Sequence, residues 1–399
     1  MFDALETHFP SDSDSERTEI VRAPGRVNLM GDHTDYTEGY VLSAAISLDT
    51  WLAFRRRRDG QVRVASMEPA EPAAFLIDDL DPNPIAAGTR HWSGQVESSA
   101  GTRRWSEYVE GAAWSLREAA LPIRGFDGLV DTAMPLGVDL GSSAALELVS
   151  GLALLGAGRI MSPPALAALA QRAEREYMGI DSGIADQFAS AAGREDRALL
   201  LDCRSLESRY VSLPFGLRVV VCDTGVPRPA RSRILDDRRA ECARALALLS
   251  ERMPGLCSLR DLDPASLKRH QAQLPDNVAR RAEHVISENA RALATALAME
   301  RGDLDELARL FAESHVSLRD NFEVGSAELD AMVQIAKGVP GVIAARATGP
   351  GLGGCTVNLV LADAVGALTA TIGREYDRRT GYRSHVYAVD IVDGAGPLA

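Results

Sequence analysis

Strand-like and helix-like segments follow one another along this chain without a regular alternation. Apolar residues alternate in VLSAAISLDTWLAFRRRR and in QVRVASM, a pattern typical of half-buried strands. Apolar residues recur at helical spacing in WSEYVEGAAWSLREA, SSAALELVSGLALLGAG and PALAALAQRAEREYMG. Because these elements do not form repeated βαβ units, the pattern predicts an α+β fold and not a doubly wound parallel sheet.

The length of 399 residues exceeds what one hydrophobic core usually supports, so we expect two domains. The strand-like segments RALLLDCRSLESRYVSLP and LRVVVCDTGV lead into a later half with long amphipathic helices around 233–252 and 276–314, and strands near 340–360 and 384–393. A polar segment near 80–104 is predicted to be a loop. We therefore expect an N-terminal domain over 1–200 and a C-terminal domain over 201–399.

Charge and composition exclude several classes of function. The net charge of −13 argues against nucleic-acid binding, which needs a basic face. No window approaches 18 uninterrupted apolar residues, which argues against a membrane span, and the acidic, polar start of the chain has no signal-peptide core. The five cysteines are widely spread and form no CxxC pair. A cytoplasmic protein with reduced thiols, acting as a monomer, is the simplest interpretation.

The segment GRVNLMGDHTDY, residues 25–36, gathers hydrogen-bonding groups beside permissive glycines. Arg26, Asp32, His33 and Asp35 lie within ten positions of one another. Such a cluster favours a site that binds a ligand rich in hydroxyls or phosphate. A solvated turn is the alternative for this segment taken alone.

Two further segments combine glycine with a helix or a tight turn. In PLGVDLGSSAALE, residues 135–147, a glycine-bearing loop leads into a helix that begins with Ser142 and Ser143. The N–H groups and dipole of a helix N-terminus suit a phosphate, although the serines could serve only as caps. In ATGPGLGGCTVNLV, residues 347–360, four glycines indicate a backbone that approaches a ligand closely or, alternatively, a simple hairpin.

The segment AEREYMGIDSGIADQFAS, residues 173–190, contributes two acids of interest. Glu174 falls within a predicted helix, and Asp186 follows a Gly-Ile pair. Phosphoryl transfer uses one carboxylate to hold Mg²⁺ and another to orient or deprotonate a hydroxyl. Taken individually, acids on amphipathic helices are usually solvated.

Together these segments resemble the GHMP kinases and, within that superfamily, the galactokinases. APGRVNLMGDHTDYTEGYVL resembles the galactokinase signature, and PLGVDLGSSAA and ATGPGLGGCTV resemble the second and third superfamily motifs. WSEYVEG, GIADQFAS and LLLDCRSLESRYVSLP also match galactokinase segments outside the superfamily core, and mevalonate and homoserine kinases lack the GDHTDY and DCRSLESRY matches. The resemblance covers residues 20–360 and implies the two-domain GHMP-kinase fold, with an active site in the cleft between the domains.

The resemblance implies a transfer of the γ-phosphate of ATP to the anomeric C1 hydroxyl of galactose. Asp186 would orient this hydroxyl and accept its proton, while Arg26 would stabilise Asp186 as an anion and the charge that develops on the phosphoryl group. The resemblance places five residues around the sugar: Asp32, His33, Asp35, Gly183 and Leu235.

The same resemblance implies an ATP site with Mg²⁺ as cofactor. Mg²⁺ would be held by Ser143 and Glu174, and Trp105 would lie near the adenine unless it only packs in the core. The residues implied to surround the phosphates are Gly137, Leu140, Gly141, Ser142, Ser143 and Ala144.

Three positions depart from the galactokinase pattern. Asp32 stands where the family usually carries Glu, next to the 6-hydroxyl of the sugar, and Leu235 stands where a Tyr is expected. Asp139 replaces a glycine of the phosphate loop, where we expect a left-handed backbone with the carboxylate turned to solvent. Two alternatives therefore stay open: a kinase for a sugar that differs at C6, such as L-arabinose or galacturonate, and a non-catalytic sugar sensor.

Overall fold

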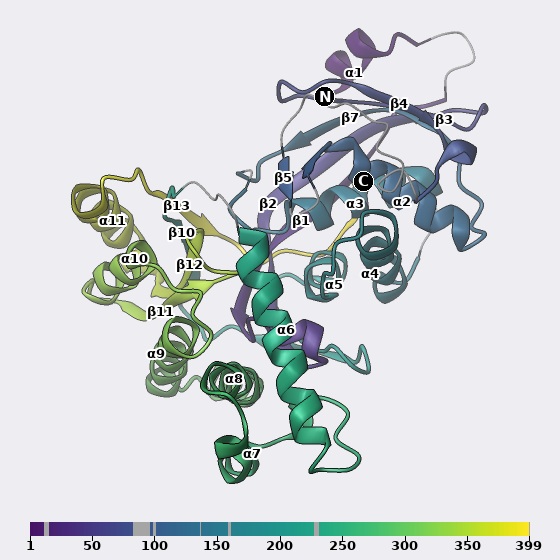
Figure 1. The fold of residues 1–399 in the computed structure, drawn as a ribbon. Coiled ribbons are helices and arrows are strands. Elements are labelled where there is room, and N and C mark those ends of the chain that lie inside the picture. The colour runs from purple at the N-terminus through teal and green to yellow at the C-terminus, as the bar shows by residue number, and fades with distance from the viewer. Residues whose placement is uncertain are drawn as a thin grey trace.

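The computed structural model describes residues 1–11, 16–82, 96–98, 101–135, 137–158, 161–226 and 231–398. Figure 1 shows two regions, each built on its own β-sheet: the larger sheet holds most of the early strands, and the smaller sheet lies among the later helices. The expected α+β class is confirmed, with helices packed against both sheets.

The larger sheet joins both ends of the chain. All of its strand pairs are antiparallel except that of β3 with β7, and β2 also pairs with β8, which pairs with β9. Its strands in spatial order are β14 (Gly396–Pro397), β1 (Glu19–Met30), β2 (Tyr40–Arg56), β7 (Phe126–Thr132), β3 (Gln61–Ser66) and β4 (Ala73–Leu76), with β8 (Arg197–Asp202) and β9 (Ser208–Ser212) at the side.

The helices of the first half cover this sheet. Leu148 and Leu152 of α3 and Val109 of α2 are buried in the same core as Phe54 and Phe126 of the sheet, whose rings form a T-shaped pair with centroids 6.0 Å apart. These helices are α1 (Phe2–His8), α2 (Ser106–Glu118), α3 (Ser142–Leu155), α4 (Pro163–Arg172) and α5 (Ala185–Ala192).

The smaller sheet is antiparallel and separates two helical layers of the second half. Its strands in spatial order are β11 (Val342–Thr348), β12 (Cys355–Leu361), β10 (Leu217–Asp223) and β13 (His385–Val389). Buried apolar residues join it to α10 and α11, and a separate apolar cluster joins α6, α7 and α8. The helices here are α6 (Arg231–Ser250), α7 (Pro264–His270), α8 (Asp276–Arg301), α9 (Leu304–Asp320), α10 (Ala327–Lys337) and α11 (Val365–Thr380).

The structure refines three expectations. The helical region expected over 276–314 is two helices, because Gly302 takes a left-handed conformation (φ 64°) and the Asp303 side chain caps α9. The chain belongs to the larger sheet as far as Ser212, the last residue of β9, and it returns to this sheet at β14. The expected domain boundary at residue 200 therefore stays a prediction. The expected loop over 80–104 lies largely outside the described residues, apart from the paired strands β5 (Val96–Ser98) and β6 (Gly101–Arg103).

None of the helices in the described part of the chain combines the length and the hydropathy that crossing a bilayer requires.

Candidate functional site

An arginine and an aspartate that lie 160 positions apart in sequence form a bidentate pair. Arg26 Nε donates to Asp186 Oδ1 at 2.6 Å, its second nitrogen pairs with Asp186 Oδ2, and its third donates to the Asp139 carbonyl. Arg26 is buried in β1, whereas the Asp186 side chain, on the first turn of α5, is 40% exposed. The pair therefore presents a fixed carboxylate, backed by a buried cation, to an incoming ligand.

The chain brings the predicted phosphate loop against this pair. Arg26 N donates to the Leu140 carbonyl at 2.7 Å, and a Cβ at Gly25 would lie 2.7 Å from the same oxygen, so only glycine fits there. Gly141 (φ 83°) is the N-cap of α3, and no side chain caps this helix. Ser142 and Ser143 therefore do not serve as caps, and the first N–H groups of α3 are open to an anion.

The other predicted loop positions lie around the same helix start. Gly137 is exposed with a left-handed φ of 77°, and Ala144 is buried in the first turn of α3. Asp139 has the expected left-handed φ of 59°. Asp139 is half-buried, and a Cβ at Gly349 would lie 3.7 Å from Asp139 Oδ2; the expectation that the carboxylate turns to solvent stays a prediction.

Glu174 lies in a π-helical turn, η3 (Ala173–Tyr177), and faces the start of α3. Burial raises the pKa of Glu174, and the groups that lower it in part are the hydroxyls of Ser182 and Ser143 and the amide of Gln187, not a cation. A buried carboxylate and a hydroxyl are hard oxygen ligands that suit Mg²⁺. Within the described residues no three His, Cys, Asp or Glu side chains gather to hold a metal.

Sequence reasoning missed two buried residues behind Glu174. Gln187 Nε2 donates to Glu174 Oε2 at 2.9 Å and reaches Glu147 Oε2 at 3.4 Å. Burial, with Glu174 nearby, raises the pKa of Glu147 well above its usual value. The sequence signal for Gln187 was its place next to Asp186, whereas Glu147 could have been found as an acid on an otherwise apolar helix.

Two predicted sugar residues, His33 and Asp35, lie on the turn that follows β1, and a third, Gly183, lies against Asp35. His33 (φ 64°) stacks on Phe322 with ring centroids 4.3 Å apart, and its Nε2 is buried without a hydrogen-bond partner among the described residues. Asp35 and Gly183 touch so closely that a Cβ at Gly183 would lie 1.6 Å from Asp35 Oδ2. Asp35, Gly183 and Arg239 line a cavity of about 630 Å³. This cavity offers room for a small polar ligand.

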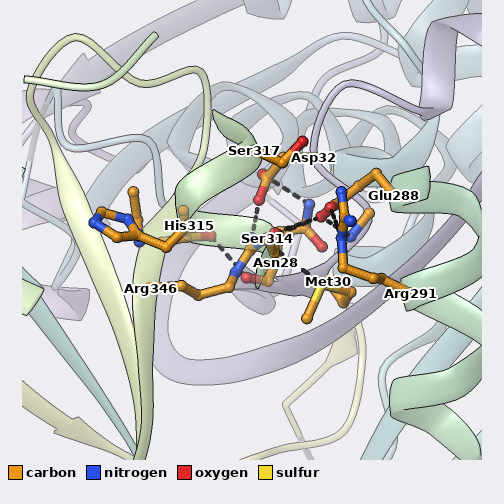
Figure 2. Close-up of polar contacts among 12 residues, drawn as sticks. Asn28, Met30, Asp32, Glu288, Arg291, Ser314, His315, Ser317 and Arg346 are labelled. Atoms are coloured by element: carbon orange, nitrogen blue, oxygen red, sulfur yellow. Dashed lines mark hydrogen bonds and ion pairs between the residues drawn. The ribbon is translucent and has the colours of Figure 1, made fainter. Parts of the chain in front are cut away.

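Asp32 is buried and is not among the residues that line this cavity. Figure 2 shows its side chain with that of Arg346, which carries the neighbouring positive charge. Asp32 Oδ1 accepts from Asn28 Nδ2 at 2.9 Å and from the Gly349 N–H at 3.1 Å. The expected contact between Asp32 and a sugar stays a prediction, and the structure adds an internal role because a buried guanidinium needs a carboxylate partner.

The two remaining predicted residues lie at the edges of cores. Leu235 on α6 is half-buried and packs against the apolar cluster of α6, α7 and α8. Trp105 packs against the main core, and its indole N–H donates to the Glu71 carbonyl at 3.3 Å. The packing alternative for Trp105 is thus realised, and its place near an adenine stays a prediction.

The glycine segment that joins β11 to β12 is both a hairpin turn and a contact between the two halves. All four glycines, Gly349, Gly351, Gly353 and Gly354, have φ between 79° and 106°, which side chains rarely adopt. The next residue, Cys355, contacts the Val138 carbonyl of the phosphate loop at 3.2 Å. The glycine segment therefore lies against the predicted phosphate loop.

Asp35 should make the unliganded protein less stable as the pH rises. Burial, followed by the charge of Asp186, raises the pKa of Asp35 from 3.8 to about 6. The folded state then binds the proton more tightly than the unfolded chain, so this contribution to the free energy of unfolding is lost between about pH 4 and pH 6. The Asp35→Asn variant lacks this titration, and its melting temperature should rise relative to the parent chain across that window. Circular dichroism melts from pH 4 to pH 8 check this, and a constant difference would contradict it.

Comparisons with known proteins show which proteins this chain is similar to. The galactokinase galactose-binding signature matches residues 6–56, and the N-terminal domain of GHMP kinases matches residues 107–194. The galactokinase of a Roseiflexus species is 39% identical over 378 residues, covering 94% of this chain and 92% of the relative. The galactokinase of Chloroflexus aurantiacus is 40% identical over 365 residues, covering 91% of this chain and 89% of the relative.

Solved structures of GHMP kinases superpose on this chain. The crystal structure of Lactococcus lactis galactokinase complexed with galactose superposes with a TM-score of 0.88 at 31% identity, covering 99% of this chain and 98% of that one. The mevalonate kinase of Methanococcus jannaschii has a TM-score of 0.63 at 16% identity, covering 94% of this chain and 99% of that one, and shares the fold.

Proposed function

Because the chain belongs to the galactokinase family of the GHMP kinases, we propose that it transfers the γ-phosphate of ATP to the C1 hydroxyl of galactose. The observation that carries this proposal is the Arg26–Asp186 pair, which lies beside the uncapped N-terminus of α3. The Arg26–Asp186 pair provides a carboxylate that can accept a proton from a hydroxyl, and the N-terminus of α3 provides N–H groups that can bind a phosphate.

In this proposal the oxygen of the C1 hydroxyl bonds to the γ-phosphorus and ADP leaves, while Asp186 accepts the proton of that hydroxyl. Arg26 holds the carboxylate in place through its bidentate contact and stabilises negative charge in the transition state. Burial lowers the pKa of Arg26, but Asp186, Asp139 and Asp35 more than offset this and raise it, so the guanidinium stays charged.

We assign the nucleotide phosphates to the first turn of α3 and to the loop before it. The N–H groups of this turn and the hydroxyls of Ser142 and Ser143 would bind phosphate oxygens. Ser143 and Glu174 would hold Mg²⁺, which neutralises charge on the phosphates when bound. The glycine segment at 349–354 would cover the phosphates from the second half.

We assign the sugar to His33, Asp35 and Gly183. A carboxylate and an imidazole suit ring hydroxyls, and an epimer that misses one of these contacts leaves a buried polar group unpaired. Galactose is favoured over the two C6 variants by the names of the relatives, and the intact Arg26–Asp186 pair does not favour a non-catalytic sensor. We further propose that the enzyme acts as a monomer and that it works in the cytoplasm, where its five free cysteines would stay reduced.

A coupled assay of ADP release with MgATP tests this function. We expect turnover with galactose and at least about tenfold lower kcat/KM with glucose, its C4 epimer, because one lost hydrogen bond to a charged group costs about that factor. L-Arabinose and galacturonate report on C6. Preference for galacturonate, or sugar binding without ADP release, would contradict the proposal.

Removing the charge of Asp139 should tighten ATP binding. Two like charges 4 Å apart repel by about 4 kcal/mol at an effective dielectric constant of 20, so even a fraction of this repulsion matters. Asparagine also tolerates a left-handed backbone, so Asp139→Asn removes the charge and keeps the conformation. We expect about a tenfold gain in ATP affinity by titration calorimetry, with galactose affinity unchanged. An unaltered ATP affinity would place the carboxylate away from the phosphates.

A further inference from the structure

A buried ion network joins the end of β1 to three elements of the second half. Glu288 and Arg291 lie on α8, Ser314 lies on α9 and Arg346 lies on β11. Figure 2 shows these side chains together with Asp32, which lies two residues past the end of β1. Glu288 and Arg346 are fully buried. The network pairs two carboxylates with two guanidiniums, so its formal charge is balanced.

The carboxylate of Glu288 holds four groups at once. Its Oε2 accepts from Arg291 Nε at 2.7 Å. Its Oε1 accepts from Ser314 Oγ at 2.8 Å, from an Arg346 nitrogen at 3.2 Å and from the backbone N–H of Gly31 at 3.1 Å. The last contact matters most for function because Gly31 belongs to the segment that carries His33 and Asp35.

A second backbone group of the same segment is held from α8. The Asp32 carbonyl lies 3.1 Å from His284 Nε2, and His284 Nδ1 lies 2.9 Å from Ser317 Oγ. Burial lowers the pKa of His284 to about 4, so the ring is neutral at pH 7. Since a carbonyl only accepts, the proton lies on Nε2, and Nδ1 accepts from the serine. Helix α8 therefore fixes the N–H of Gly31 and the C=O of Asp32.

These contacts hold a backbone segment that has two positive φ angles. Gly31 has a φ of 97° and His33 a φ of 64°. A histidine in the left-handed region is strained, and such strain persists only where the surroundings enforce it. A buried ion network is a costly way to gain stability, because apolar side chains of similar volume often do as well. Its hydrogen bonds, however, have direction, which apolar contacts lack.

We propose that Glu288, supported by Arg346 and Ser314, is a positioning residue that sets the sugar-binding turn of the first half from the second half. Asp32 belongs to the same network, because its carboxylate pairs with Arg346 and accepts a hydrogen bond from the Gly349 N–H of the glycine segment. The position of His33, and hence the affinity for the sugar, then depends on a residue that does not touch the sugar. This inference rests on the proposed sugar kinase function.

The test compares Glu288→Gln with the parent chain and with Asp127→Asn as a matched control. Asp127 is also a buried carboxylate between two arginines, Arg57 and Arg63, but it lies in the larger sheet on β7. We expect Glu288→Gln to raise the KM for galactose by about 10- to 100-fold, the effect of one lost contact to a charged group, with the KM for ATP within about threefold. Asp127→Asn should change neither constant.

Hydrogen–deuterium exchange of peptides that span residues 26–40 gives a second readout without substrate. Glu288→Gln should speed exchange there at least about tenfold, while peptides from α3 and α5 keep the parent rate. If Glu288→Gln does not fold, Ser314→Ala keeps every charge and should show the same two changes at smaller size. Parent-like exchange at 26–40 together with a parent-like galactose KM would overturn the proposal. A parent chain without kinase activity would instead refute the proposed function. The exchange rate at residues 26–40 would still test whether Glu288 positions this segment.

Discussion

Replacing Asp186 by asparagine is expected to lower kcat by about 10²–10⁴, the usual contribution of a positioned acid–base group. The Asp186 carboxylate is held by two nitrogens of Arg26 and is still 40% exposed, so it is fixed and accessible at the same time. Asparagine keeps the shape of the side chain but cannot accept the proton of the sugar hydroxyl. Galactose binding should change far less than turnover.

The matched control for this variant is Asp181→Asn, in the loop that precedes α5. Asp181 is an exposed carboxylate whose nearest cation is Arg175 at 3.8 Å, and such surface pairs contribute little. Its turnover should stay within about twofold of the parent chain. Steady-state kinetics with galactose and MgATP, together with calorimetric binding of galactose, separate the two effects. Parent-like turnover in Asp186→Asn would remove Asp186 from the catalytic role.

The fold class and the main helices could be predicted from periodicity, but the addition of β14 to the edge of the larger sheet could not. The strand β14 has two residues, Gly396 and Pro397, and no apolar pattern that would mark it. Its pairing with β1 depends on where the tertiary structure places this end of the chain. The division of the long helical region at Gly302 was visible in the sequence as a glycine followed by Asp303, a typical stop and start signal.

The site was predictable in its residue types and less so in its geometry. Arg26 and Asp186 were paired by resemblance, since nothing in their spacing of 160 residues indicates a contact. The inward turn of Asp32 could not be foreseen, because its partner Arg346 lies in the otherwise apolar strand VIAARAT, 314 positions away.

A sequence signal for the buried network did exist. His284, Glu288 and Arg291 follow one another at spacings of four and three, which places them on one face of α8. That face also carries the buried Val285 and Ala292, so polar groups recur on the side that should be apolar. Charged residues at helical spacing on a buried face indicate a polar network. Which segment they hold is decided by tertiary structure alone.

Adding one methyl group at Gly183 should be nearly as damaging as removing Asp186, and for a different reason. A Cβ at this position would lie 1.6 Å from Asp35 Oδ2 and 2.8 Å from Asp35 Cβ. Rotation of the carboxylate alone cannot relieve the second contact, so the turn that carries Asp35 must move. A displacement of about 1 Å in a substrate-positioning group costs about 10² in rate. Gly183→Ala should therefore lower kcat/KM for galactose by about 10², mainly through KM.

A second glycine provides the control for this substitution. Gly366 lies in the first turn of α11, and a Cβ there would meet no atom within 4 Å. Gly366→Ala should leave both kinetic constants unchanged and stabilise the fold by about 0.4–1 kcal/mol, since alanine loses less backbone entropy. Gly183→Ala should also lower the melting temperature, because the clash strains the folded state even without sugar. A galactose KM within threefold of the parent value would mean that Asp35 yields without cost, and the assignment of Asp35 and Gly183 to the sugar would then be wrong.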